Sequence, residues 1–211
     1  MKHFEIITEA DARTLDFGST VLLASGGHIT PLARDTLRER RITVVRDDQV
    51  SDGESALTPV MPVRTVAIGS DHTGVALKRQ LTATLRADGI AVHDLGTHDA
   101  ATVDYPDVAA RVARAVAEHE ADAGVVIDGA GIGSSIAANK IDGVRAVMCT
   151  NETVARYSRE HNGANVLCLG ASLLTAEQAV AIVRVWMRTG MREPRYIRRL
   201  AKIRALERSR Q

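Results

Sequence analysis

The chain has 211 residues, of which 45% are hydrophobic and 25% charged, and its formal net charge is +1 at pH 7. This length and composition are typical of a globular protein with one sizeable domain and an appendage. The near-neutral charge gives no long-range electrostatic attraction to nucleic acids or membranes. An aromatic content of 3% leaves few side chains that could stack on nucleic-acid bases. No apolar run approaches the ~20 residues of a membrane-spanning helix.

The N-terminus and the cysteines indicate a reducing compartment. Residues 1–16 have mixed charge and lack the long apolar core of a signal peptide. The two cysteines, Cys149 and Cys168, each lie in an apolar run, and the sequence has no CxxC pair. We therefore expect reduced, packed thiols in a cytoplasmic protein, with neither a disulfide nor a metal site.

Residues 1–62 differ in pattern from the rest of the chain. An apolar run over 20–24 is broken at Gly26-Gly27, and Thr30-Pro31 has the residue types of a helix N-cap and first helical position. A strand is predicted over 42–45. Residues 47–62 contain Asp, Ser, Gly and two prolines, which is typical of a linker. The sequence thus predicts a small appendage and linker over 1–62, joined to a main domain over 63–211.

From residue 64 onward, apolar runs alternate with amphipathic stretches. Helical spacing of apolar residues predicts helices between the runs, including a short one over 152–160 and a last one over 176–187. Alternating strands and helices predict an α/β protein, specifically a three-layer α/β/α Rossmann-like domain with a five-stranded parallel sheet. The predicted strands are 65–69, 90–95, 123–127, 144–148 and 166–169.

The tail from residue 184 to 211 contains nine arginines and one lysine. A solvated basic helix explains it better than a nucleic-acid site does. Arg195 and Arg199 are one helical turn apart, so their guanidinium groups can bind one phosphate together.

Polar residues gather at the ends of the predicted strands. The first strand is followed by Asp71-His72, and the third by Asp128 and a glycine turn that opens a helix. Backbone N–H groups of such a turn, together with the helix N-terminus, favour an anion. Tyr105 follows the second strand and His161-Asn162 precede the fifth. We interpret this collection as an anion site with acid–base groups at the edge of an open α/β sheet.

Each of these residues also has an alternative role. Asp71-His72 can be a helix cap followed by a surface histidine. His161 can be a capping residue at a helix C-terminus. Asp128 can be a solvated residue in a tight strand-to-helix turn.

Residues 65–202 resemble the ribose-5-phosphate isomerase B and galactose-6-phosphate isomerase family. The resemblance rests on segments that occur in order along the domain: AIGSDHTGVALK, DLGT, VDYPDVA, GAGIGSSIAANK, GVRAVMC, SREHNGAN, LCLG and a final Arg-x-x-x-Arg. It implies isomerisation of an aldose phosphate to a ketose phosphate without metal or cofactor. It also implies a homodimer, with a tetramer as the larger alternative, whose sites lie between subunits.

The resemblance assigns roles residue by residue. Asp71 contacts the substrate, His161 assists ring opening and Asn162 orients the enediolate. Arg195 and Arg199 bind phosphate. The glycine turn donates N–H groups to the enediolate oxygen. The residues implied to contact the substrate are His72, Tyr105, Gly129, Gly131, Ile132, Gly133, Ser134 and Asn162.

The chain departs from the family pattern at the base. The family commonly has Cys at position 128 or Glu at position 134, where this chain has Asp128 and Ser134. Asp128 can replace the base if partial burial raises its pKa. Ala130, Ser172 and Tyr196 stand where the family has Thr or Ser, Arg, and His, which removes one hydroxyl donor and one phosphate contact.

We therefore predict an isomerase of a sugar phosphate, with ribose 5-phosphate and ribulose 5-phosphate as the expected pair and an enediolate as the intermediate. The alternatives are an isomerase of a four- or six-carbon sugar phosphate, and a catalytically silent sugar-phosphate binder or scaffold. A nucleic-acid or membrane partner is not expected.

The segment HITPLARDTLRERRITVV, at 28–45, resembles a short segment of several bacterial microcompartment enzymes. It implies a microcompartment shell or cargo partner for residues 1–62 and a location inside such a compartment. An appendage that only packs on its own domain is the alternative.

Overall fold

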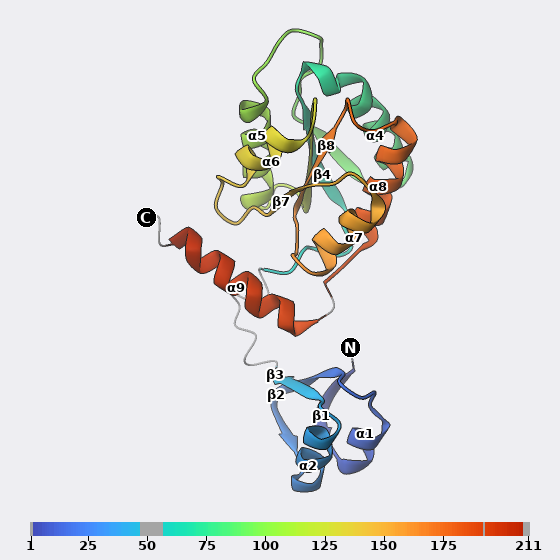
Figure 1. Ribbon diagram of the computed structural model, residues 1–211, viewed down its shortest axis with the longest axis vertical. Coiled ribbons are helices and arrows are strands. Elements are labelled where there is room, and N and C mark those ends of the chain that lie inside the picture. The colour runs from blue at the N-terminus through green and yellow to red at the C-terminus, as the bar shows by residue number, and fades with distance from the viewer. Residues whose placement is uncertain (1, 47–56, 192, 209–211) are drawn as a thin grey trace. The chain divides into compact units, whose positions relative to one another are not determined.

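A computed structural model describes residues 2–46, 57–191 and 193–208 (Figure 1). The chain divides into two compact units, one made of residues 1–57 and 192–201 and the other of residues 58–191 and 202–211. The sequence placed the boundary between residues 62 and 63 and the whole C-terminal helix in the second domain. Of the predicted linker, residues 47–56 lie outside the described part, whereas Leu57 and Pro59 are buried.

The first unit contains a three-stranded parallel sheet in the order β1-β2-β3. Two helices connect the strands, and a small core of aliphatic side chains, including Leu23 and Leu37, packs between them. The elements are β1 (His3–Ile7), α1 (Glu9–Thr14), β2 (Thr20–Ile29), α2 (Pro31–Glu39) and β3 (Thr43–Arg46).

The start of α2 is as predicted, because Thr30 accepts a hydrogen bond from the Ala33 N–H and Pro31 occupies the first turn. The predicted break at Gly26-Gly27 is wrong, since both glycines lie inside β2. Gly26 has a φ of 75°, and the pairing with β1 shifts register there, so the glycines form a bulge and the strand continues. The sequence prediction also missed β1 and α1.

The second unit contains the five-stranded parallel sheet that the sequence predicted, in the order β5-β4-β6-β8-β7. Its strands are β4 (Thr65–Ser70), β5 (Ala91–Asp94), β6 (Ala123–Asp128), β7 (Ala146–Met148) and β8 (Val166–Gly170). Its helices are η2 (His72–Gly74), α4 (Val75–Ala87), α5 (Tyr105–Ala117), α6 (Ile132–Ala138), α7 (Glu152–Glu160) and α8 (Ala176–Arg188). The last helix, α9 (Pro194–Arg208), is divided between the two units.

Alternating residues of the central strands face two separate cores. Ile68 and Ile127 pack with side chains of α4, α7 and α8, whereas Ala67 and Val126 pack with those of α5 and α6. Figure 1 shows these two helix layers on opposite faces of the sheet. Strands covered on both faces must be apolar throughout, which explains the continuous apolar runs in the sequence. The predicted three-layer α/β/α architecture is confirmed.

The cysteines pack inside this unit as predicted. Cys149 and Cys168 are both buried and free. Burial raises the pKa of the Cys149 thiol to about 11, and burial also raises the pKa of Cys168. Both are therefore protonated, unreactive thiols at neutral pH. Within the described ranges, no helix is long and apolar enough to cross a membrane.

Parallel register defines two edges of the sheet. Asp128 on β6 pairs with Gly170 on β8, and Gly124 pairs with Val166. The ends of β4, β6 and β8 therefore lie together at one edge, here called the C-terminal edge. Their beginnings lie at the other, the N-terminal edge. In open α/β sheets, ligands bind outside the C-terminal edge.

Candidate active site

Asp128 ends β6, and its carboxylate turns back onto the glycine turn that follows. Oδ1 accepts hydrogen bonds from the backbone N–H groups of Ala130, at 2.8 Å, and Gly131, and Oδ2 accepts one from the N–H of Ser134 at 2.9 Å. Gly131 has a φ of 77°, a conformation that glycine adopts without strain. The carboxylate is therefore the hydrogen-bond acceptor of three backbone N–H groups at the start of α6.

These contacts decide the protonation of Asp128. Burial alone raises its pKa, but the hydrogen bonds from Ser134, Gly131 and Ala130 outweigh burial and hold the pKa below its ordinary value. N–H donors aimed at a carboxylate stabilise its charged form. The expectation that partial burial raises the pKa of Asp128 is therefore wrong, because these donors also had to be counted.

The glycine turn is tightly packed on its inner side and open at Gly129. A Cβ at Gly133 would lie 2.6 Å from ring carbons of Tyr105, and one at Gly131 would lie 2.9 Å from the Leu169 backbone. A Cβ at Gly129 would meet only the Thr73 hydroxyl within 4 Å, at 3.8 Å. Thr73 and Tyr105 therefore flank the turn on which Asp128 closes.

Asp71 caps the short helix η2, which is the alternative role that the sequence offered for it. Its Oδ1 accepts hydrogen bonds from the Thr73 N–H at 2.9 Å, the Thr73 hydroxyl at 2.6 Å and the Gly74 N–H at 3.2 Å. The Asp71 N–H donates to the Ile127 carbonyl at 3.0 Å, which ties the end of β4 to the end of β6. His72 is half-buried, and in the described part of the chain its Nδ1 is buried without a hydrogen-bond partner.

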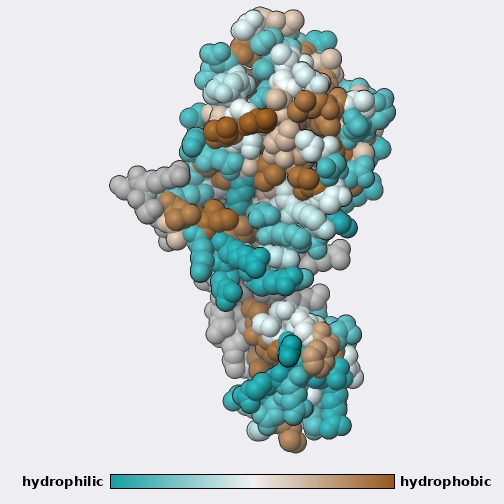
Figure 2. Space-filling view, in the orientation of Figure 1, coloured by the Kyte–Doolittle hydropathy of each residue, from teal (hydrophilic) through white to brown (hydrophobic). Residues whose placement is uncertain are grey.

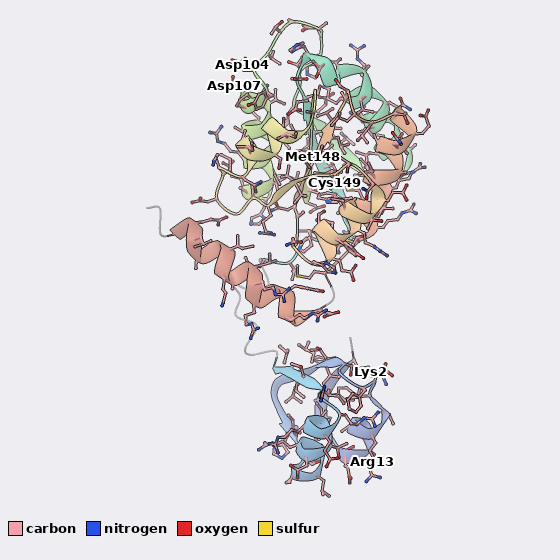
Figure 3. All side chains as sticks on the ribbon, in the orientation of Figure 1. Lys2, Arg13, Asp104, Asp107, Met148 and Cys149 are labelled. Carbon is pink, nitrogen blue, oxygen red and sulfur yellow. The ribbon has the colours of Figure 1, made fainter. Side chains whose placement is uncertain are left out.

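Tyr105 and the end of β8 complete this edge. Tyr105 begins α5, and Figure 3 labels Asp104 and Asp107 beside it at the start of that helix. After β8, the N–H of Ala171 donates to the Asp128 carbonyl at 2.8 Å and that of Ser172 to the Gly129 carbonyl at 3.0 Å. The C-terminal edge thus brings together all the predicted site residues that follow β4 and β6, together with Tyr105.

His161 and Asn162 lie at the opposite edge. His161 caps the C-terminus of α7, and β8 begins only at Val166. The length of β8, at ~3.3 Å per residue, separates the two edges by about 13 Å. The sequence analysis grouped His161 and Asn162 with Asp128 because all three lie next to a strand. Asp128 is at the end of its strand, whereas His161 and Asn162 precede the beginning of theirs, so they lie at different edges of the sheet. The His161 ring stacks on Tyr157, with ring centroids 4.7 Å apart.

Arg195 and Arg199 lie on one side of α9, around Tyr196. Their guanidinium carbons are 4.9 and 5.7 Å from the centre of its ring. Arg195 also donates to the Tyr196 hydroxyl at 3.0 Å and pairs with Glu193 at 2.5 Å. The predicted pairing of the two arginines on one helix face is confirmed. Both fall within residues 192–201, which group with the first unit.

Comparison with known proteins identifies the family of the chain. The model of the Ribose/Galactose Isomerase family matches residues 66–203. The chain is 41% identical over 148 residues to ribose-5-phosphate isomerase B of Escherichia coli K12, an alignment that covers 70% of this chain and 99% of the relative. The chain belongs to the ribose/galactose isomerase family.

Solved structures match this isomerase over the same region. Ribose-5-phosphate isomerase B of Clostridium thermocellum superimposes with a TM-score of 0.69 at 45% identity, covering 70% of this chain and 99% of that one. The enzyme of Mycoplasma genitalium, solved with bound ribulose-5-phosphate, has a TM-score of 0.66 at 37% identity, covering 68% and 96%. The family match at 66–203 therefore includes the whole five-stranded sheet of the second unit and also the residues of α9 that group with the first unit.

Sequence reasoning missed two buried cations of the isomerase. Lys78 of α4 is buried and pairs with Asp94 at the end of β5. Its signal was present, because Lys78 shares a helical stripe with Leu81 and Leu85. The Arg159 side chain is fully buried. Its hydrogen-bond acceptors include the carbonyls of Ala164 and Thr189, and Thr189 is distant from it in the sequence, so no local pattern indicated this burial.

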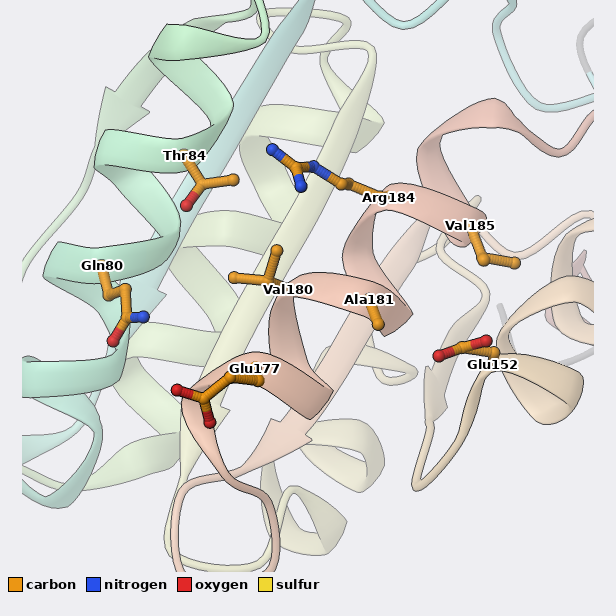
Figure 4. Close-up of a pocket in the computed structure, with 8 residues that line it drawn as sticks. All are labelled: Gln80, Thr84, Glu152, Glu177, Val180, Ala181, Arg184 and Val185. Carbon is orange, nitrogen blue, oxygen red and sulfur yellow. The ribbon is translucent and has the colours of Figure 1, made fainter.

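A groove of about 600 Å³ lies on the outer helix layer, between α4 and α8. Figure 4 shows Gln80 and Thr84 on one side and Val180 and Arg184 on the other. None of the predicted site residues lines it. Within the described residues, no group of three or more His, Cys, Asp or Glu side chains is placed to hold a metal ion.

Proposed function

We propose that this isomerase interconverts ribose 5-phosphate and ribulose 5-phosphate. One observation carries the proposal: a carboxylate, Asp128, adjoins a turn of N–H donors at the C-terminal edge of a chain that spans almost the whole of its ribose-5-phosphate isomerase B relatives. The Mycoplasma genitalium relative, whose printed description names bound ribulose-5-phosphate, supports this pair of sugars.

The reaction requires a base and a group that stabilises an oxyanion. The Asp128 carboxylate removes the proton from C2, the C–H electron pair forms the C1–C2 double bond, and the carbonyl pair moves onto O1. The hydroxyl proton then moves from O2 to O1, C2 becomes the carbonyl, and C1 takes the proton back from Asp128. Atoms and electrons are conserved, and N–H groups of the glycine turn stabilise the enediolate oxygen.

We propose that a second copy of the chain completes the site. His161 and Asn162 lie at the edge opposite Asp128, so one subunit does not bring them to the reacting carbons. Ile132 and Ile136 of α6 are 55% and 58% exposed beside the glycine turn, an apolar surface that a partner would cover. Figure 2 shows hydrophobic residues gathered over α6 and over the C-terminal end of α9.

Subunit complementation tests the shared site. Asp128→Asn and His161→Gln should each be nearly inactive alone. In an equal mixture half of the dimers are mixed, and each mixed dimer has one intact site of two, so about a quarter of wild-type activity should return. A mixture that exchanges subunits, as native mass spectrometry would show, but stays inactive would contradict a site built from two chains.

The arginines of α9 are the proposed phosphate ligands. The guanidinium groups of Arg195 and Arg199 both lie near the Tyr196 ring, one helical turn apart in sequence. Replacing either with Ala should raise KM by the equivalent of about 1.5–3 kcal/mol, the scale of a charge-assisted hydrogen bond. An unchanged KM in both variants would move the phosphate site elsewhere.

The decisive experiment for the reaction is a panel of four-, five- and six-carbon aldose phosphates incubated with the full chain. Formation of ribulose 5-phosphate with the highest kcat/KM supports the proposal. A higher value for a four- or six-carbon sugar would reassign the substrate. Binding without turnover of any sugar would make the chain a silent binder.

We propose that the first unit serves assembly, with a microcompartment shell or cargo protein as its partner. The strands and helices of residues 2–46 have a core of their own, and Asp71, Asp128 and His161 all belong to the second unit. The proposed phosphate ligands Arg195 and Arg199 group with the first unit but lie outside residues 1–62. A chain lacking residues 1–62 should keep its kcat and change only its higher assembly or cellular location. Loss of activity with the fold retained would contradict this role.

A further inference from the structure

The loop over residues 161–164, which carries two of the candidate site residues, lies between the end of α7 and the start of β8. Its carbonyls at Gly163 and Ala164 therefore belong to no helix or strand. Arg145 Nε donates to the Gly163 carbonyl at 2.8 Å, and Arg159 Nη1 donates to the Ala164 carbonyl at 2.9 Å. Two cations from outside the loop thus hold two consecutive carbonyls of it.

The guanidinium of Arg159 connects this loop to two other segments of the chain. Its Nε donates to the Thr189 carbonyl at 3.2 Å, just past the end of α8, and its Nη2 donates to the Val60 carbonyl at 3.2 Å, ahead of β4. The guanidinium carbon lies 4.5 Å from the centre of the Trp186 ring. Because a guanidinium is planar and rigid, acceptors on two of its sides fix the direction of its third donor. The position of the Ala164 carbonyl is thereby set relative to α8 and to the chain before β4.

This arrangement is costly, since it buries a positive charge without a negative partner. The Arg159 side chain is fully buried, and among the described residues its N–H groups bond to backbone carbonyls and the Met61 sulfur and to no carboxylate. Burial, together with repulsion from Arg145, lowers the pKa of Arg159 to about 10, so Arg159 is charged at neutral pH. A neutral donor would satisfy the same carbonyls without the desolvation of a charge. What a guanidinium adds is several donors in one fixed geometry.

We propose that Arg159, together with Arg145, is a positioning residue of the isomerase: the two side chains hold the 161–164 loop so that His161 and Asn162 reach the substrate. This inference rests on the proposed function, in which these two residues act at a site shared with a second copy of the chain. In this role neither arginine touches the substrate, and each acts through the loop. Val60 precedes the family match at 66–203, so one anchor of the loop lies in the segment that leads from the first unit.

Arg159→Lys tests this role, because lysine keeps the charge but offers a single ammonium group in place of a planar fork. The loop should lose its fixed direction. An error of about 1 Å in the placement of a catalytic group costs about 10²-fold in rate, so we expect kcat for ribose 5-phosphate to fall by about 10- to 100-fold. Arg184→Lys on the surface of α8 is the matched control and should keep its kcat.

Subunit complementation separates a misplaced loop from a chain that is damaged throughout. In a dimer mixed with Asp128→Asn, one site combines the intact Asp128 of the Arg159→Lys chain with the intact loop of the other chain. About a quarter of wild-type activity should therefore return, as in any mixture of complementary subunits. In a dimer mixed with His161→Gln, every site contains a defective loop, so activity should stay at the residual level of Arg159→Lys alone.

Rescue by both partners, rescue by neither, or an unchanged kcat of Arg159→Lys would overturn the proposal. Arg145→Lys should give the same pattern, and it replaces Arg159→Lys if circular dichroism shows that the latter does not fold. Failure of both variants to fold would make the two arginines purely structural and would also overturn it.

The mixture of Asp128→Asn with His161→Gln, measured alongside, tests the proposed function separately. If its subunits exchange and it stays inactive, the shared site fails. The kcat of folded Arg159→Lys against that of Arg184→Lys then decides the positioning role within a single chain.

Discussion

The two edges of the five-stranded sheet differ in how side chains satisfy the free backbone groups. At the C-terminal edge, Asp71 and Asp128 accept hydrogen bonds from backbone N–H groups of turns and helix starts. At the N-terminal edge, the Arg159 guanidinium donates to the carbonyls of Ala164 at 2.9 Å and Thr189 at 3.2 Å, where chain segments leave helices. Arg145 donates likewise to the Gly163 carbonyl at 2.8 Å.

The polarity of the backbone explains this difference. Every helix of a parallel α/β unit starts near the C-terminal edge and ends near the N-terminal edge, so one edge presents free N–H groups and the other free carbonyls. Carboxylates such as Asp128 satisfy N–H groups at one edge, and the buried Arg159 satisfies carbonyls at the other. The separation is incomplete, because Asp122 accepts N–H groups at the N-terminal edge and Lys78 pairs with Asp94 at the C-terminal edge. The proposed anionic base and the N–H groups proposed to stabilise the enediolate oxygen therefore share one edge.

The largest expected effect tests the C-terminal edge. Asp128→Asn keeps the shape of the side chain but removes the proton acceptor, so kcat for the sugar phosphate should fall by roughly 10²–10⁴. Steady-state kinetics at neutral pH measure this. Asp122→Asn, an acceptor of backbone N–H groups at the other edge, is the control and should keep its kcat. Near-normal turnover of Asp128→Asn would shift the base to His161 or Ser134.

The second prediction tests the N-terminal edge through stability. Arg159→Met leaves buried carbonyls without donors and removes a guanidinium that lies 4.5 Å from the centre of the Trp186 ring. The free energy of unfolding should fall by about 2–4 kcal/mol, measured by urea denaturation.

Arg184→Met is its matched control. Arg184 pairs with Asp88 at 2.8 Å on the surface, and exposed pairs contribute about 0–1 kcal/mol. A loss in Arg159→Met no greater than in this control would show that the backbone carbonyls of the N-terminal edge do not depend on the buried cation.

A smaller change in the free energy of unfolding is expected from pH. The pKa of Asp128 is lower in the folded than in the unfolded chain, so its charged form stabilises the fold above its ordinary pKa of 3.8. This contribution, on the order of the 1.5–3 kcal/mol of a charge-assisted hydrogen bond, is lost as the pH falls from there through the lowered pKa.

Denaturation of wild type and Asp128→Asn across that range measures the contribution. The wild type should be the more stable at neutral pH, and the difference should shrink below pH 3.8. A constant difference would show that the carboxylate gains nothing from the N–H groups.

Much of the fold was predictable because its signals are local. The strand Ala123–Asp128 is one apolar run, since both of its faces are covered. The pair Thr30-Pro31 predicted the start of α2 because cap chemistry needs only neighbouring residues. The break predicted at Gly26-Gly27 was wrong because that prediction used local propensity alone. Pairing with β1, which is distant in the sequence, continues the strand through a bulge.

The candidate site was predictable as a set of residues and not as an arrangement. Asp128 and the glycine turn adjoin in sequence, so their proximity followed directly. Whether the carboxylate would close on the turn depended on the φ of Gly131 and on the start of α6. His161 adjoins a strand as well, but at its beginning, and only the direction of β8 in the sheet separates it from Asp128.

By itself, the sequence determined the family, the five parallel strands and the buried cysteines. These follow from hydrophobic period, cap residues and motif spacing, which act over short stretches of chain. Only the tertiary structure decided that His161 lies across the sheet from Asp128 and that backbone donors lower the pKa of Asp128. The first depends on the direction of β8 in the sheet, and the second on where the backbone N–H groups of the glycine turn point. A pattern of residue types along the chain specifies neither.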